Sequence, residues 1–481
     1  MESTQNSECK AAGTGKSFWA WAAGSLMVRV LLICSPLSSS FSLRPEVSTP
    51  LTSIRRLAEG YWLKQSSMSP YAGPMYHGSP LLLHLLGPLI LQSDSFEMYN
   101  RKLCRFANLV KISPIFLANF FFDPLFLSQQ LIFRNSFPFL IADIASAVLL
   151  RKCGQLLHSS YRLNLQDLEI AAIFKSPGDI AALTYLWNPL TIVSCVGLST
   201  SSIDNVFVIL ALYGACSGNA SLAAIGWVIA SHLSLYPIVL IIPVILLLVY
   251  GPDTPPRKLF VLKNLEGTQN PNFYKIFHFF CWAILWLLCI LTLCHTSIKE
   301  HSNLWEMLRR THGFTLAVED LSPNIGVLWY FFAEAFDFFR SFFLLVFHIN
   351  ILFMLLPLAI RIPHRPFFLA FTYVAISSML KSYPSVGDCA LCLGLLTLFS
   401  SQLADMKFSF FLSCGYVGVF LFSPVMHNLW IWRGTGNANF YFATAIGYSC
   451  LEILLIMDSV STMLHHDRML RKLVITSRKV E

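Results

Sequence analysis

Charged residues are scarce in this chain, and their scarcity excludes a water-soluble globular protein of this size. Asp, Glu, Lys and Arg together make up 12% of the 481 residues, whereas soluble domains carry about 25%. Hydrophobic residues make up 55%, phenylalanine alone occurs 40 times, and mean hydropathy is +0.60. Because so little polar surface is available, lipid must surround most of the chain.

The sequence also lacks the motifs of several enzyme classes. It has no HExxH pair, no P-loop and no GxSxG elbow. Most of its 13 cysteines lie in apolar stretches, where a thiol behaves as a small hydrophobe. Cys389 and Cys392 have CxxC spacing but enter an apolar run. We therefore predict no catalytic residue, no metal and no cofactor in this chain.

Long apolar blocks repeat to the C-terminus and predict an all-α polytopic membrane protein. Runs such as 279–294 are almost continuously apolar and do not alternate, which favours helices over a β-barrel. Lys and Arg, with a net charge of +8, gather in short runs between these blocks. That placement is typical of cytosolic loops and does not indicate nucleic-acid binding. The basic runs lie at 152–176, 251–275, 361–365 and 465–481.

Counting crossings between the basic runs gives about 12 transmembrane helices. Between 365 and the tail, four apolar blocks return the chain to the same side, and between 275 and 361 two blocks make one excursion. Residues 220–250 form a long block that Pro237 is expected to break into two. The total is 12 if blocks 80–91 and 114–133 stay on one side, and 14 if both cross. Both counts place both termini in the cytosol.

This topology divides the chain into three parts. Residues 1–16 are a cytosolic N-terminal tail, residues 17–463 a multi-pass membrane domain, and residues 464–481 a basic cytosolic tail. The outward side collects the polar loops in which Pro, Gly, Asn and Trp cluster. These loops span residues 43–78, 296–324, 381–384 and 428–440, and loops of this kind often carry function.

The first two outward loops supply three candidate binding residues. Tyr71 and His77 lie among three prolines and two glycines, which predict a rigid, tightly turned loop. Asn324 follows in the segment that leads into an aromatic helix. Each of these side chains can contact a ligand at an interface. The competing interpretation is a well-packed cap in which they serve only structure.

Three further segments carry polar candidates. Glu334 and Asp337 lie one helical turn apart among aromatics, and carboxylates in a membrane by default suggest function. They can instead pair with Arg340 or stay solvated. Asp388 lies seven residues after Lys381, so the two can pair with each other or meet a phosphate and an amine. They can also belong to a plain turn with both charges solvated. The Gly-rich loop at 434–440 carries two side-chain amides, those of Asn437 and Asn439. These amides can bind hydroxyls or phosphates of a ligand, or the loop can be a plain turn.

Six sequence blocks resemble one family of membrane proteins, in the same order along the chain. They are SPYAGPMYHGSPL (69–81), LWNPLTIVSCV (186–196), LSLYPIVLIIP (233–243), LSPNIGVLWYFFAEAFDFF (321–339), KSYPSVGDCAL (381–391) and GNANFYFA (436–443). The family is the phosphatidylinositol glycan class U family, the multi-spanning subunits of the glycosylphosphatidylinositol (GPI) transamidase. The segment 92–136 departs from the family pattern, as either a lineage-specific insertion or an error in the gene model.

The resemblance implies a subunit of the endoplasmic reticulum membrane with its site in the lumen. It implies the GT-C membrane fold of dolichol-phosphate-sugar-dependent glycosyltransferases, whose active members need an acid in the first luminal loop, often in a DxD. Here that loop has only Glu46 and Glu59 and no DxD, so we expect a non-catalytic subunit that recognises the GPI lipid. Expected partners are the other transamidase subunits, including a caspase-like cysteine protease, the GPI glycolipid and membrane phospholipids.

Two other functions remain open at this stage. The chain can be an active dolichol-phosphate-mannose-dependent GPI mannosyltransferase, in which case Glu46 or Glu59 would have to serve as the acid. It can also be a transporter, with Asp143, Asp204 and Glu334 lining a path through the membrane. The sequence shows no inverted repeat of the kind that transporters usually carry.

Overall fold

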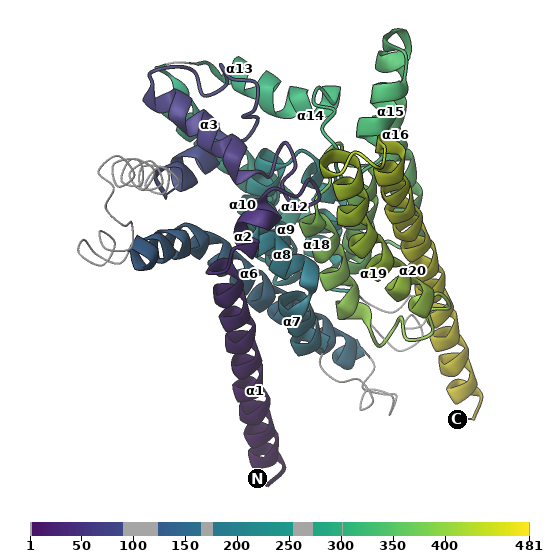
Figure 1. Ribbon diagram of the computed structural model, residues 1–481. Helices are drawn as coiled ribbons and strands as arrows, with labels where there is room; N and C mark the ends of the chain where they lie inside the picture. The colour runs from purple at the N-terminus through teal and green to yellow at the C-terminus, as the bar shows by residue number, and fades with distance from the viewer. Residues whose placement is uncertain (1, 90–123, 165–176, 254–272, 301, 481) are drawn as a thin grey trace.

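The described regular structure is entirely helical (Figure 1). The computed structural model describes residues 2–89, 124–164, 177–253, 273–300 and 302–480. Most of the 92–136 segment lies outside these ranges. The description resumes at α6 (Pro124–Asn164), so the origin of the segment stays open.

Four helices in the described ranges are long and apolar enough to cross a membrane. They cover the apolar blocks of the sequence at 276–298, 341–360, 408–426 and 441–463, which confirms a multi-pass, all-helical membrane protein. A bent pair, α7 (Pro177–Trp187) and α8 (Pro189–Val196), meets at 51° and would make a fifth span. The count of about 12 spans therefore stays a prediction. The four helices are α12 (Phe273–Ile298), α16 (Asp337–Arg361), α19 (Ser409–His427) and α20 (Ala438–Val480).

Shorter apolar helices form the middle of the bundle. At α17 (Pro366–Leu380), all but the last residue are buried, because α11, α16, α18 and α20 pack around it. The break expected at Pro237 is present, and a 3-10 turn at Tyr236–Leu240 separates the two helices on either side of it. The other short helices are α9 (Ser201–Cys216), α10 (Ala220–Leu233), α11 (Ile241–Tyr250) and α18 (Val386–Leu396). The N-terminal helix α1 (Glu2–Ile33) is longer, and only its part Ser17–Ile33 is apolar.

Buried ion pairs join helices that are distant in the sequence. Arg29 of α1 lies in the middle of an apolar block, and its guanidinium lies 3.1 Å from the Asp143 carboxylate of α6. Near the other basic segments, Asp467 of α20 accepts from Arg365 at 2.5 Å and from His364 at 2.8 Å. The second cluster holds the 361–365 loop against the C-terminal helix, as expected if both lie on the same side of the membrane.

Helices of the first two predicted outward loops lie at one end of the bundle. Figure 1 shows α3 (Ile54–Gln65), α13 (Leu304–Leu308) and α14 (Phe314–Ala317) of these loops, followed by α15 (Leu328–Glu334), at the end opposite to both chain termini. A guanidinium–carboxylate contact of 2.6 Å joins Arg56 of α3 to Asp320. The Tyr383 phenol oxygen accepts from the Asp320 backbone N–H at 3.0 Å. These two contacts connect the predicted loops 43–78, 296–324 and 381–384.

Candidate functional site

The exposed polar candidates meet where α15 faces the beginning of α20. The chain leaves α19 through a π-helical turn at Asn428–Trp432 and then reverses at Gly434, whose φ of 63° favours glycine. The backbone N–H groups of Thr435 and Gly436 both donate to the Leu429 carbonyl at 3.0 Å. This fixed turn delivers Asn437 and Asn439, both exposed, to the start of α20.

The two asparagines use their side-chain oxygens within the protein. Asn439 Oδ1 accepts a hydrogen bond from the Tyr330 hydroxyl, and Asn437 Oδ1 accepts from the Phe440 backbone N–H at 3.4 Å. The Tyr330 hydroxyl also interacts with the Glu334 carboxylate, one turn further along α15. We call Tyr330, Glu334, Asn437 and Asn439 the amide rim. The engaged oxygens orient each amide so that its NH₂ group is the donor for a ligand.

Aromatic rings form a floor beneath the amide rim. Trp329 stacks on Trp430 with 6.1 Å between ring centroids, and Tyr330 stacks on Phe442 at 4.4 Å. Tyr441 lies against both tryptophans. Trp329 and Tyr441 are buried, whereas Trp430 and Phe442 are half-buried and can be reached by a ligand. Aromatic faces with nearby hydrogen-bond donors suit a ligand that is partly apolar and partly hydroxylated. We call Trp329, Trp430, Tyr441 and Phe442 the aromatic floor.

Glu334 is exposed. Arg340, which the sequence offered as a partner for this carboxylate, is used elsewhere. The Arg340 guanidinium donates to the backbone carbonyls of Ala317 at 3.3 Å and Val318 at 2.7 Å. Asp337 begins α16 and is also exposed. Glu334 is therefore an exposed member of the amide rim.

The first two outward loops place their candidates differently, since Tyr71, His77 and Asn324 are all buried. The two ring nitrogens of His77 lie 3.0 Å from the carbonyls of Arg310 and Pro74. The Tyr71 hydroxyl donates to the Gly78 carbonyl at 3.0 Å. Asn324 accepts from the Gly326 N–H at 2.8 Å and donates to the Ser322 carbonyl at 3.2 Å. This geometry favours the packed-cap interpretation for all three.

Aromatic stacking and charge pairing stiffen the same cap. His77 stacks on Phe314 with 3.5 Å between centroids, and Phe314 stacks on Tyr383 at 5.3 Å. Burial lowers the pKa of His77 and so favours the neutral ring at neutral pH. Burial acts to raise the pKa of Asp320, but hydrogen bonds from Ser322 and the Arg56 charge outweigh it and lower the pKa.

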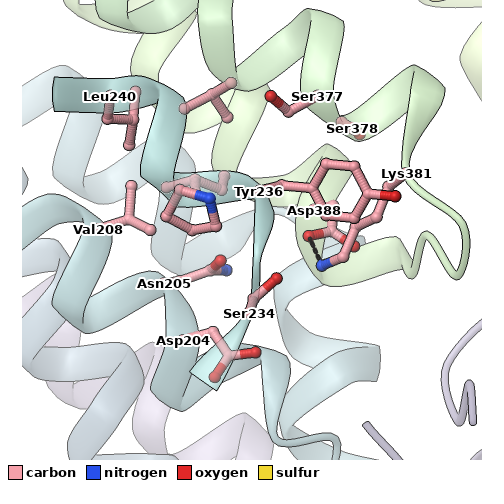
Figure 2. Close-up of a pocket in the computed structure, with 13 residues that line it drawn as sticks. Asp204, Asn205, Val208, Ser234, Tyr236, Leu240, Ser377, Ser378, Lys381 and Asp388 are labelled. Atoms are coloured by element: carbon pink, nitrogen blue, oxygen red, sulfur yellow. Dashed lines mark hydrogen bonds and ion pairs between the residues drawn. The ribbon is translucent and has the colours of Figure 1, made fainter. Parts of the chain in front are cut away.

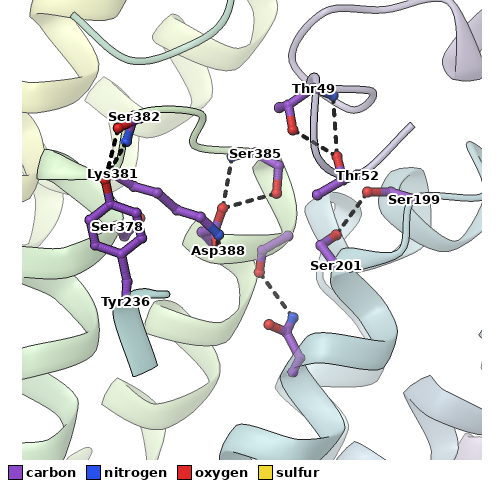
Figure 3. Close-up of polar contacts among 12 residues, drawn as sticks. Thr49, Thr52, Ser199, Ser201, Tyr236, Ser378, Lys381, Ser382, Ser385 and Asp388 are labelled. Carbon is purple, nitrogen blue, oxygen red and sulfur yellow. Dashed lines mark hydrogen bonds and ion pairs between the residues drawn. The ribbon is translucent and has the colours of Figure 1, made fainter. Parts of the chain in front are cut away.

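Asp388 faces inward, into a small polar cavity beneath the cap (Figure 2). The Lys381 ammonium lies 3.0 Å from Asp388 Oδ1, which confirms that the two residues pair. Asp388 Oδ2 accepts from the Ser385 backbone and hydroxyl at 2.8 and 3.0 Å, and this capping box begins α18 (Figure 3). Both oxygens of Asp388 are therefore used within the protein.

The cavity holds water-sized groups only. Its volume is about 50 Å³, and Asp204, Tyr236 and Lys381 contribute to its lining. A water needs roughly 10–15 Å³ of such space, whereas ligand pockets of ~300 Å³ or more are the norm. The Tyr236 hydroxyl contacts the Ser382 hydroxyl at 2.9 Å (Figure 3). The lining residues come from α9, the Tyr236 turn and the 381–385 loop. We therefore assign the cavity a structural role in packing these segments together.

A cysteine–histidine contact was not expected from the sequence. Cys294 Sγ lies 3.4 Å from His232 Nε2, which also lies 2.8 Å from the Ser79 hydroxyl. The three residues come from α12, α10 and the first outward loop, so no local spacing could have indicated them. All three are buried, which separates the thiol from any substrate. Within the described ranges, no group of three or more His, Cys, Asp or Glu residues could hold a metal.

Comparison with known proteins gives one consistent family. The model of the family "GPI transamidase subunit PIG-U" matches residues 23–448. The chain is 32% identical over 436 residues to the GPI-anchor transamidase component PIGU of Homo sapiens, covering 90% of each protein. It is 26% identical over 421 residues to the GPI transamidase component GAB1 of Saccharomyces cerevisiae, covering 86% of this chain and 85% of the relative.

Proposed function

The chain belongs to the PIG-U family of GPI transamidase subunits, and on that premise we propose that it recognises and positions the GPI lipid without taking part in the chemistry. As a subunit it assembles with other components of the transamidase. In the proposed arrangement the protein lies in the endoplasmic reticulum membrane on a GT-C-like bundle. Both termini are in the cytosol and the amide rim is in the lumen.

The amide rim is the observation that carries this proposal. It presents two exposed asparagine amides above an aromatic floor, at the end of the bundle where α15 lies. Amide NH₂ groups donate to phosphate and hydroxyl oxygens, the groups that a phosphorylated glycan offers. Hydrocarbon tails would pack against the membrane-facing helices. The rim would thereby hold the glycolipid at a fixed height above the membrane.

Positioning of this kind accelerates a reaction without a catalytic group. Holding two reactants in the correct geometry replaces an encounter from solution and supplies effective molarities of up to roughly 10⁵–10⁸ M. The transamidation itself requires a thiolate and a base that water can reach. Cys294 and His232 are adjacent but buried, so the nucleophile is assigned to a caspase-like partner subunit.

The lipid that accumulates without this subunit tests the proposal. Cells that lack the chain are expected to build up complete GPI that is not attached to protein, because assembly of the lipid does not need the amide rim. Thin-layer chromatography of mannose-labelled glycolipids measures the accumulated GPI. A build-up of undermannosylated lipid would instead identify a mannosyltransferase, with Glu46 or Glu59 as the first-loop acid.

A further inference from the structure

A large apolar cavity lies between α19 and the α8–α18 pair. Its volume is about 700 Å³, within the ~300–1,000 Å³ range of small-molecule sites. It shares no residue with the amide rim. Its walls are almost wholly hydrocarbon and come from all three helices, with Val193 from α8, Leu393 and Leu396 from α18, and Leu412 and Phe420 from α19.

The cavity opens sideways, towards the surface that faces lipid. Val417 and Leu421 line it and are 61% and 64% exposed. Both lie on α19, a helix that is long and apolar enough to span the membrane. Side chains this apolar and this exposed would be unfavourable in water. A membrane lipid can therefore enter the cavity without leaving the bilayer.

One end of the cavity is polar and carries a cation. Arg44 and Glu46 line this end. Arg44 is held in place by donating to the Pro424 carbonyl at 3.3 Å. The remaining N–H groups of Arg44, which has five, suit an anionic oxygen.

Glu46, beside Arg44, is engaged within the protein. Its side chain is buried and accepts from the Ser423 hydroxyl at 2.9 Å. Burial raises the pKa of Glu46, against the opposing influence of its hydrogen bonds and the Arg44 charge. Glu46 also interacts with Tyr441 of the aromatic floor. The polar end of the cavity therefore lies directly behind the amide rim.

We propose that this cavity binds one membrane phospholipid, with an acyl chain between α19 and the α8–α18 pair and the phosphodiester at Arg44. Guanidinium binds phosphate oxygens in a planar, charge-assisted geometry, and an apolar cavity open to the bilayer accepts a chain that is already in hydrocarbon. The site is separate from the amide rim, so it does not depend on the GPI-positioning proposal. The phosphatidylinositol part of GPI has the same chemistry, and the two sources must be distinguished.

Lipid analysis of the purified transamidase complex tests the proposal. The complex is isolated in mild detergent from cells blocked at the first step of GPI synthesis, and from unblocked cells, and bound phospholipid is measured by native mass spectrometry. Two variants remove the site by different means. Arg44→Gln removes the cation, and Ser413→Trp fills the cavity from α19. Their matched controls are Arg55→Gln, at an exposed arginine close by in the chain, and Cys414→Trp, at the next, exposed position of α19 that does not line the cavity.

We expect the wild-type complex to retain about one more phospholipid than either site variant in both cell types. Retention should fall roughly tenfold in Arg44→Gln through loss of a charge-assisted contact. It should also fall in Ser413→Trp, because the indole takes the space of the acyl chain, and it should not change in the controls. Equal retention in all five complexes would overturn the proposal, and so would occupancy by detergent alone or by neutral lipid. Lipid present only in the GPI-competent cells would identify the occupant as GPI. If the Arg44→Gln complex does not assemble, the comparison of Ser413→Trp with its control Cys414→Trp tests the proposal.

Discussion

Replacing both Asn437 and Asn439 with alanine is expected to lower GPI attachment about 10- to 30-fold while the complex stays assembled. Each alanine removes one donor that we assign to the glycan, and a hydrogen bond contributes roughly 1 kcal/mol, with 1.4 kcal/mol per factor of ten. Both side chains are exposed, so their loss leaves no buried group unpaired. The measurement is the rate of anchor addition to a reporter in cells that lack the endogenous chain.

Thr435→Ala is the matched control, since Thr435 is exposed in the same turn and its backbone makes the turn's hydrogen bond to Leu429. It should leave the rate unchanged. Co-precipitation of the other subunits shows whether each variant assembles. Full reporter anchoring by the double variant would show that the asparagines only shape the turn, and the amide rim would lose its assigned role.

Replacing Lys381 with methionine is expected to destabilise the protein by about 3–5 kcal/mol, the usual cost of leaving one member of a buried ion pair without its partner. Lys381 is buried and pairs with Asp388 at 3.0 Å, beside the Asp204 carboxylate in the same cavity. The variant would leave two carboxylates close together in a low-dielectric site. The loss of stability is measured by heating the complex and determining, by size-exclusion chromatography, the fraction that stays assembled.

A double variant separates charge pairing from ligand binding at this cavity. Asparagine at position 388 can still accept from the Ser385 N–H that begins α18, so Lys381→Met combined with Asp388→Asn should recover part of the lost stability. Lys407→Met removes an exposed lysine and should have no effect. Normal thermal stability of Lys381→Met with loss of anchor attachment would instead assign Lys381 to ligand contact.

Hydropathy was sufficient to predict the four long helices α12, α16, α19 and α20, because the cost of exposing peptide groups to lipid acts on every residue in the same way. The two apolar blocks expected between the basic runs at 251–275 and 361–365 correspond to α12 and α16. Short-range features were predictable for a similar reason. The break at Pro237 follows from the missing N–H of proline, and the pairing of Lys381 with Asp388 follows from their positions on either side of one turn.

Loop burial could not be predicted, because it depends on contacts between distant segments. Asn324 and Asn439 have the same side chain and both lie in polar outward loops. Asn324 is buried, whereas Asn439 is exposed and contacts Tyr330 of α15, 109 residues away. Nothing local to either asparagine distinguishes the two environments. The contact between Cys294 and His232 and the cavity at Arg44 are likewise properties of the packed bundle.

The central claim is that this subunit holds a complete GPI for a separate catalytic subunit. The most direct test is a mild-detergent pull-down of the tagged chain, with mass spectrometry of the proteins and lipids that co-purify. The claim predicts recovery of a caspase-like protease, the other transamidase subunits and complete GPI, with GPI reduced in the Asn437→Ala, Asn439→Ala variant. Recovery of the chain alone, or with an unfinished glycolipid and dolichol-phosphate-mannose, would contradict it.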